Sequence, residues 1–175
     1  MNRVANFEKV SFEQFKKDWV DTFDLKDTLN EKIEEDIKNI YEQIKLPERA
    51  TSGSAGYDFI IPIDLTLKSK DEIKIPTGIR VSIVEGWWLG CLPRSGLGFK
   101  YKLQLNNTMG VIDSDYYYSD NEGHIFIKMT NDGNKTLEIR AGEGFAQGIF
   151  LPYGITTNDN ATAIRNGGFG STNKN

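Results

Sequence analysis

Five short segments of this 175-residue chain combine residue types that could bind and hydrolyse a phosphorylated small molecule. Arginine makes charge-assisted hydrogen bonds to phosphate oxygens, glycine lets the backbone approach a ligand closely, and a carboxylate can accept a proton from water. The segments are Ala55–Phe59, Pro93–Gly98, Gly110–Tyr116, Gly142–Gln147 and Gly167–Thr172. Together they predict a site for an anionic ligand, built on loops.

The second segment carries the clearest phosphate chemistry. Arg94 and Ser95 stand beside Gly96 and Gly98, so consecutive backbone N–H groups can face an anion while the side chains add a charge and a hydroxyl donor. On the residues alone, a β-turn with an exposed arginine explains the segment equally well.

Asp113 is the candidate general base. It follows the apolar run Gly110-Val111-Ile112, where a carboxylate can accept a proton from water or bind a sugar hydroxyl. The structural alternative is an aspartate that begins a turn. Gln147 is predicted to lie on a strand, where it would be either a ligand contact or a polar side chain facing solvent.

The elements that must position these residues change near Leu46. Before it the chain has no glycine, and Ser11 with Gln14 predicts a capping box that begins a helix over Phe12–Trp19. A second helix is predicted from apolar residues spaced by three and four, and Pro47 ends it. Its stripe is Leu29, Ile33, Ile37, Ile40, Tyr41 and Ile44. We favour packing of this stripe against the body or a neighbouring subunit over docking of another protein.

After Pro47 the pattern predicts short strands separated by Gly, Pro and Asn-Asp-Gly turns, which is typical of an all-β sandwich, jelly roll or barrel. The predicted strands are Asp58–Ile61, Asp71–Ile75, Gly78–Ile83, Trp87–Leu92, Gly110–Ile112, His124–Met129, Thr136–Ile139 and Ala146–Leu151. By composition the last stretch, Thr156–Asn175, is a mobile arm, although Phe169 among glycines argues against an inert tail.

Composition limits the class of partner and the compartment. The net charge of -4 gives no global basic field that would draw the chain to nucleic acid. We find no signal peptide and no apolar run of about 20 residues that would span a membrane, so we expect a cytoplasmic protein. One histidine and one cysteine, His124 and Cys91, offer no zinc spacing and no internal disulfide.

In this order the five segments resemble the five motifs of the trimeric dUTPase family, over about Leu46 to Thr172. The resemblance implies a distorted jelly-roll β-barrel over residues 46–155, a flexible C-terminal arm over 156–175 and a homotrimer with sites at subunit contacts. A helical extension over residues 1–45 lies outside the common core. Because every motif follows Leu46, we expect removal of residues 1–45 to leave activity in place and to lower stability or solubility.

The resemblance also implies an activity, the hydrolysis of dUTP to dUMP and pyrophosphate, with Mg²⁺ held by the triphosphate. Asp113 would deprotonate the attacking water and hold the 3′-hydroxyl, and Tyr116 would pack under the sugar and exclude a 2′-hydroxyl. Asp58 would support the metal site through water or through Arg94. The other implied substrate contacts are Arg94, Ser95, Gly96 and Gln147 for phosphates, Asn107, Gly110, Val111 and Ile112 for uracil, and Phe169, Gly170, Ser171 and Thr172 for the closed arm.

The chain departs from the family pattern at three places. The hairpin after Tyr116 is longer than usual, and Gly144 stands where the family usually has an arginine. Arg165 stands one position away from the place of the family's arginine that binds the γ-phosphate. The related alternative, a dCTP deaminase, needs a glutamate that the strand at residues 124–131 lacks. A regulator that binds a repressor protein through a dUTPase scaffold is the non-enzyme alternative.

Overall fold

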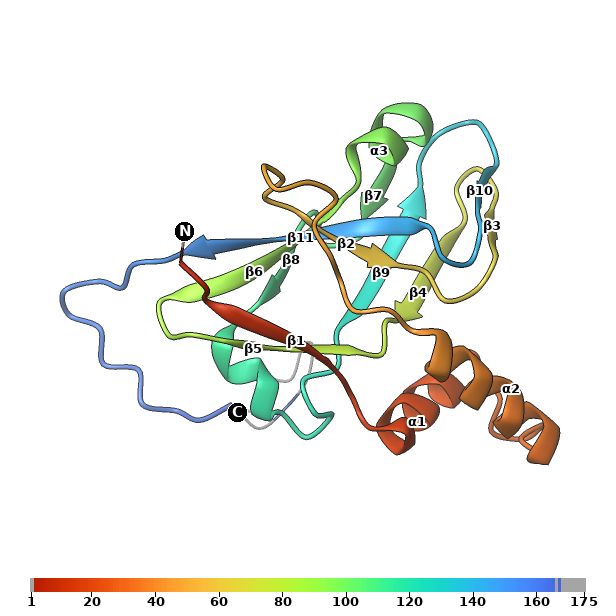
Figure 1. Cartoon of the computed structure of the whole chain (residues 1–175), viewed down its shortest axis with the longest axis horizontal. Helices are drawn as coiled ribbons and strands as arrows, with labels where there is room; N and C mark the ends of the chain where they lie inside the picture. Colours follow the sequence, from red (N-terminus) through yellow and green to blue (C-terminus); the bar gives the residue numbers. More distant parts are fainter. Residues whose placement is uncertain (1, 166, 168–175) are drawn as a thin grey trace.

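The computed structural model describes residues 2–165 and 167. Its β-strands form one body with two helices at one end of it (Figure 1). The chain begins with strand β1 (Ala5–Lys9), continues through helices α1 (Phe12–Thr22) and α2 (Glu31–Gln43), and then enters the strand-rich part. The predicted all-β class with N-terminal helices is confirmed.

The sheets are antiparallel and join strands that are far apart in sequence. The largest sheet has the order β2 (Tyr57–Ile60), β11 (Gly144–Pro152), β6 (Trp87–Pro93), β8 (Gly110–Ile112). A second sheet has the order β4 (Glu72–Pro76), β9 (Phe126–Asn131), β7 (Leu103–Leu105). Two ribbons complete the body, β1 with β5 (Ile79–Ile83) and β3 (Leu65–Leu67) with β10 (Leu137–Ile139).

Alternation along the strands places one set of side chains in a shared apolar core. In β9, Ile127 and Met129 are buried while Lys128 is exposed, as expected for a strand with one face inward. Phe59 of β2 and Phe145 of β11 are also buried, so the large sheet and the β4-β9-β7 sheet contribute to the same core. This core fixes the strand ends that carry the candidate site.

The N-terminal helices pack onto that body. Ile37 and Ile44 of the stripe are buried in the main core cluster, as are Phe15 and Trp19 of α1. The favoured interpretation of the stripe, packing against the body, is therefore confirmed. Leu29 is the exception, because it precedes α2 and is 41% exposed. The Gln14 amide N–H donates to the Ser11 hydroxyl, which caps α1 as predicted.

Several elements differ from the expected ones. Strands β1, β3 and β7 were not predicted, and the expected Pro93–Gly98 loop instead leads into helix α3 (Ser95–Tyr101), with Arg94 at its N-cap. A 3₁₀ helix, η1 (Ser114–Tyr118), follows β8. Within the described part of the chain, no helix combines the length and apolar character needed to cross a membrane.

Candidate active site

Arg94 is held at the end of β6 by two elements. Its Nε lies 3.0 Å from Asp58 Oδ1 on β2, and its guanidinium donates to the Gly144 carbonyl of β11 at 3.0 Å. The pairing of β11 with both β2 and β6 makes both contacts possible. The Arg94 side chain stays 41% exposed, so it keeps donors available for an anion.

A cavity of about 400 Å³ opens beside Arg94 at the start of α3. Ser95 and Gln147 line it together with Arg94, so the structure gathers three of the residues expected to contact phosphate. Gln147 is fixed by a 3.0 Å hydrogen bond from its side-chain amide to the Pro93 carbonyl. We call this cavity the phosphate-side cavity, after the contacts expected of its lining residues.

Two glycines leave room for these side chains. A β-carbon at Gly144 would lie 2.9 Å from a guanidinium nitrogen of Arg94, so a side chain at this position would displace that guanidinium. A β-carbon at Gly56 would lie 2.5 Å from Oε1 of Gln147. The absence of a side chain at Gly56 therefore leaves room for the Gln147 amide.

The Gly56→Ala variant should reorient Gln147 without unfolding the protein, because the atom in its way is the far end of a flexible side chain. We expect kcat/KM to fall about tenfold with a Tm change of only a few degrees. Steady-state kinetics and thermal unfolding of the same preparation measure both quantities. Gly53→Ala, where nothing lies within 4 Å of the added β-carbon, is the matched control.

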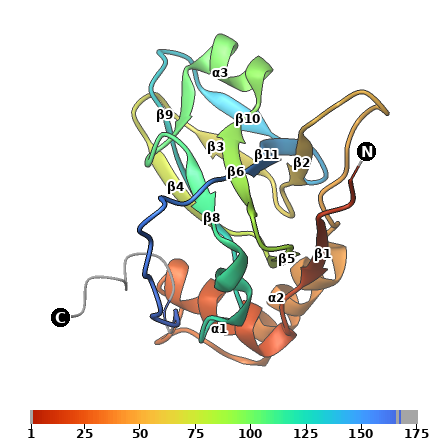
Figure 2. The same cartoon turned by 90° about the vertical axis from the view of Figure 1, so that its left-hand side faces the viewer.

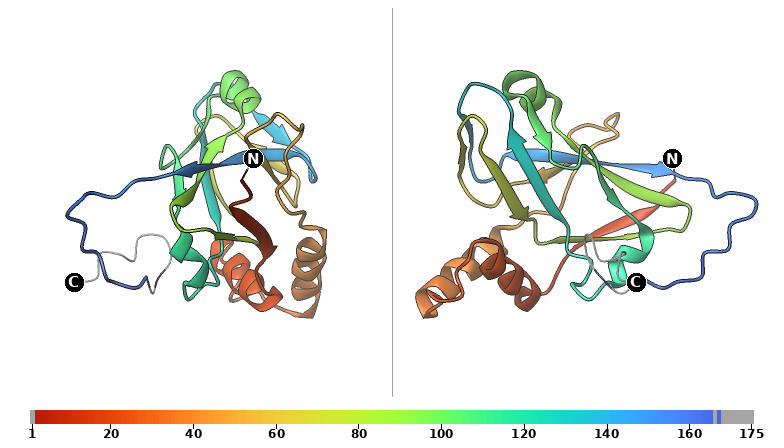
Figure 3. Two further views of the ribbon diagram at one scale, coloured as in Figure 1. Left: turned by 60° about the vertical axis from the view of Figure 1, so that its left-hand side comes forward. Right: turned by 180° about the vertical axis from the view of Figure 1, so that it is seen from behind.

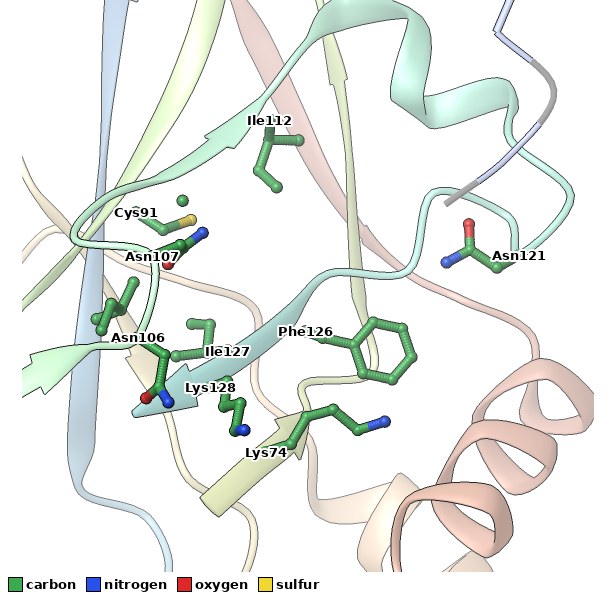
Figure 4. Close-up of a pocket in the computed structure, with 11 residues that line it drawn as sticks. Lys74, Cys91, Asn106, Asn107, Ile112, Asn121, Phe126, Ile127 and Lys128 are labelled. Atoms are coloured by element: carbon green, nitrogen blue, oxygen red, sulfur yellow. The ribbon is translucent and has the colours of Figure 1, made fainter. Parts of the chain in front are cut away.

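A second cavity, of about 480 Å³, lies beside the loop between β7 and β8. Three of the residues expected to contact uracil, Asn107, Gly110 and Ile112, line it, and Cys91 forms part of its wall (Figure 4). Burial raises the pKa of the Cys91 thiol to about 12, so this group is a neutral apolar surface. We call this cavity the nucleoside-side cavity, after the contacts expected of its lining residues.

Val111 differs from its neighbours on β8. The strand buries Gly110 and Ile112 and leaves Val111 49% exposed, so the Val111 side chain faces away from the nucleoside-side cavity. Only its backbone can contribute there. Lys74, Phe126 and Asn121 also line this cavity, and no sequence motif pointed to them (Figure 4).

Asp113 follows β8 at the N-cap of η1, and its side chain is 46% exposed. The arm leaves β11, extends away from the body and returns to η1 (Figure 3). There a nitrogen of the Arg165 guanidinium lies 2.5 Å from Asp113 Oδ2, and the Arg165 Nε lies 3.0 Å from Asp115 Oδ1. Arg165 was expected to bind phosphate, but in this structure it pairs with the candidate base.

Tyr116, the residue expected to pack under a sugar, is buried in this structure. Its side chain is 3% exposed, its hydroxyl donates to the His124 carbonyl at 2.7 Å, and the Arg165 guanidinium lies 5.8 Å from its ring centre. Burial raises the pKa of Tyr116 to about 12. The expected contacts at Phe169, Gly170, Ser171 and Thr172 lie outside the described residues.

Comparison with known proteins places this geometry in a family. A family model described as dUTPase matches residues 42–173. The chain is 41% identical over 133 residues to the deoxyuridine 5′-triphosphate nucleotidohydrolase of Lactococcus lactis subsp. lactis (strain IL1403), covering 74% of this chain and 88% of that protein. The Tolumonas auensis (strain DSM 9187 / NBRC 110442 / TA 4) protein of the same name is 37% identical over 143 residues, covering 77% and 91%.

Solved structures agree. The crystal structure of dUTPase from Streptococcus mutans superposes with a TM-score of 0.58 at 37% identity, covering 66% of this chain and 90% of that chain. A mutant of the Staphylococcus bacteriophage 80alpha dUTPase with dUpNHpp has a TM-score of 0.62, covering 93% of this chain and 98% of that chain. Its 18% identity makes it evidence for the fold alone. By sequence and by structure, this chain belongs to the dUTPase family.

Proposed function

We propose that this protein hydrolyses dUTP to dUMP and pyrophosphate, with Asp113 as the general base. The observation that carries the proposal is the position of Asp113, a half-exposed carboxylate at the end of the strand that lines the nucleoside-side cavity. Membership of the dUTPase family supports the substrate.

The proposed reaction is an attack of water on the triphosphate. A water molecule attacks the α-phosphorus, a new P–O bond forms, and the bond from that phosphorus to the bridging oxygen breaks to release pyrophosphate. Asp113 takes the proton of the water. Arg94, Ser95 and Gln147 donate hydrogen bonds to the phosphate oxygens as negative charge shifts toward the leaving group.

The proposed hydrolysis of dUTP implies a Mg²⁺ ion, which the triphosphate itself would hold. Among the described residues, no three His, Cys, Asp or Glu side chains gather at one point, and Asp58 pairs with Arg94. An ion that takes its oxygens from the triphosphate and from water needs no such cluster. When bound, it neutralises charge on the phosphates, and Asp58 would support it through water or through Arg94.

We propose that the active enzyme is a homotrimer whose sites are shared between subunits. The two cavities support this because they have no lining residue in common: Arg94, Ser95 and Gln147 line one, and Asn107 and Gly110 line the other. A nucleoside triphosphate needs both kinds of contact. A second copy of the chain can bring a phosphate-side cavity to the nucleoside-side cavity of the first.

The arm is proposed to close over substrate. In this structure Ile155 and Ile164 are 74% and 86% exposed, and Arg165 covers Asp113. A non-hydrolysable dUTP analogue with Mg²⁺ should suppress proteolysis between residues 156 and 175, whereas dUMP should not. Ordering about ten residues costs several kcal/mol, which base stacking and γ-phosphate contacts together must offset.

Limited proteolysis followed by mass spectrometry measures this protection. Phe169→Ala should lower kcat/KM for dUTP and leave the fold unchanged. Equal protection by dUMP, or none by the analogue, contradicts arm closure.

The central test is pyrophosphate release from dUTP, dCTP, dTTP and UTP, with and without Mg²⁺. The proposal expects rapid release from dUTP only, and loss of that release when Mg²⁺ is removed with a chelator. Ammonia release from dCTP would instead identify a deaminase. No pyrophosphate from dUTP with Mg²⁺ present contradicts the proposed function.

A further inference from the structure

Two departures from the common family core meet in this structure. One is the N-terminal segment (residues 5–22), and the other is the Tyr117–His124 loop, the long hairpin after Tyr116. Figure 2 shows α1 beside this loop. Three side-chain contacts join them: Tyr117 to Glu8 at 2.9 Å, Ser11 to Glu122 at 2.7 and 2.6 Å, and His124 to Asp18 at 2.5 Å.

The Ser11–Glu122 contact completes the cap of α1 in an unexpected way. A capping box needs a carboxylate or amide that accepts the N–H of the capping residue. Gln14 does not do this, because its side chain donates to Asp18 at 2.8 Å. Glu122 accepts the Ser11 N–H instead, from a position more than a hundred residues away. The beginning of α1 is therefore built jointly with the loop.

The His124–Asp18 contact is the buried one. The His124 side chain is fully buried, and its Nε2 accepts the Gly78 backbone N–H at 2.8 Å. Because Nε2 accepts, the ring is neutral and its proton is on Nδ1, which donates to Asp18 Oδ2. The centre of the Phe126 ring lies 4.6 Å from the imidazole centre, and the two rings pack together. Removing Asp18 would leave a buried donor without its acceptor.

The loop in turn fixes two residues of the candidate site. The His124 carbonyl accepts the Tyr116 hydroxyl at 2.7 Å. The Asn121 side chain donates to the same hydroxyl at 2.9 Å and lines the nucleoside-side cavity (Figure 4). A shift of His124 therefore moves Tyr116 and Asn121 together.

We propose that Asp18 is a positioning residue for the nucleoside site: through His124 it fixes Tyr116 and Asn121, and so sets the preference for deoxyribose over ribose. The inference rests on the proposed function, in which Tyr116 excludes the 2′-hydroxyl. It assigns the N-terminal helix a role in substrate selection as well as in stability.

The test compares three variants in the full chain by steady-state kinetics with dUTP and UTP. Asp18→Ala should raise KM for dUTP about tenfold, change kcat less than about threefold, and lower the dUTP/UTP ratio of kcat/KM about tenfold. Asp18→Asn keeps an oxygen acceptor for Nδ1–H and should stay within about threefold of wild type. Asp21→Ala is the matched control, because Asp21 is on the same helix and pairs with exposed Lys26.

A double-mutant cycle separates positioning from general stability. Tyr116→Phe removes the hydroxyl that links the ring to His124, so Asp18→Ala should have little further effect on the dUTP/UTP ratio in that background. Additive effects of the two substitutions on the dUTP/UTP ratio overturn the proposal. A lower Tm with an unchanged ratio in Asp18→Ala overturns it as well.

If Asp18→Ala does not fold, Glu122→Ala provides the same test at a more exposed contact, and an unchanged ratio overturns the proposal. Wild-type enzyme that fails to hydrolyse dUTP contradicts the proposed function. If the wild-type enzyme is active and Asp18→Ala leaves the dUTP/UTP ratio of kcat/KM unchanged, only this inference is contradicted.

Discussion

Replacement of Asp113 by asparagine should abolish turnover while leaving nucleotide binding nearly intact. The amide is close in shape to the carboxylate but cannot accept a proton from water, and a general base contributes about 10²–10⁴-fold. The loss should therefore appear in kcat. The Asp113→Asn variant also loses the ion pair between Asp113 and Arg165. The arm is then freer to close over the nucleotide, which offsets any loss of nucleotide affinity caused by the substitution. Single-turnover kinetics and calorimetric titration with a non-hydrolysable analogue measure the two effects.

Asp115→Asn is the control that separates the base from the ion pair. Asp115 binds the same arginine at 3.0 Å, so its loss weakens the arm contact without removing the proposed base. We expect less than about a tenfold change in kcat for this variant. An Asp113→Asn enzyme that keeps more than about a tenth of wild-type kcat would show that another group accepts the proton.

Deletion of residues 1–45 should prevent stable folding and so abolish activity, although from the sequence we expected activity to remain and only stability or solubility to fall. The deletion removes β1, the partner of β5, and core side chains that include Phe15, Trp19 and Ile37. Burial of each such side chain contributes about 1.5–3 kcal/mol. Since a domain is stable by only about 5–15 kcal/mol, the remainder should be insoluble or molten. Circular dichroism, thermal unfolding and gel filtration of the truncated chain test this.

A pair of point variants makes the same prediction quantitative. Trp19→Ala should lower the free energy of unfolding by about 3–5 kcal/mol, because its side chain is 5% exposed in the core. Leu29→Ala removes an exposed side chain and should change the free energy of unfolding by less than about 0.5 kcal/mol. A truncated chain that is folded and active would contradict both the core assignment and the role of Asp18.

The pattern of apolar residues in the sequence predicts the longer strands, such as β6 and β11, in which buried and exposed positions alternate or apolar residues form a run. It misses β1 because Ala5–Lys9 alternates weakly and acquires its strand conformation from pairing with β5. It misses β3 and β7 because a three-residue strand has almost no period. Helix α3 is missed because Gly96 and Gly98 lower its intrinsic helix propensity.

The candidate site is predictable where local motifs define it and not where distant contacts do. The grouping of Arg94, Ser95 and Gln147 beside one cavity follows from their motifs. The pairing of Arg165 with Asp113 does not, because it depends on the path of the arm. The bond from His124 to Asp18 joins residues 106 positions apart. No local motif in the sequence pointed to either pairing.

The order of strand pairing has a consequence during synthesis on the ribosome. Strand β1 leaves the exit tunnel first, yet its partner is β5, with Ala5 opposite Ile83. Strands β2 and β6 must wait longer still, because β11, which lies between them, ends at Pro152. At roughly 5–20 residues per second, the growing chain spends several seconds with unpaired strand edges. We therefore expect the nascent polypeptide to need protection by chaperones until nearly all of it has been translated.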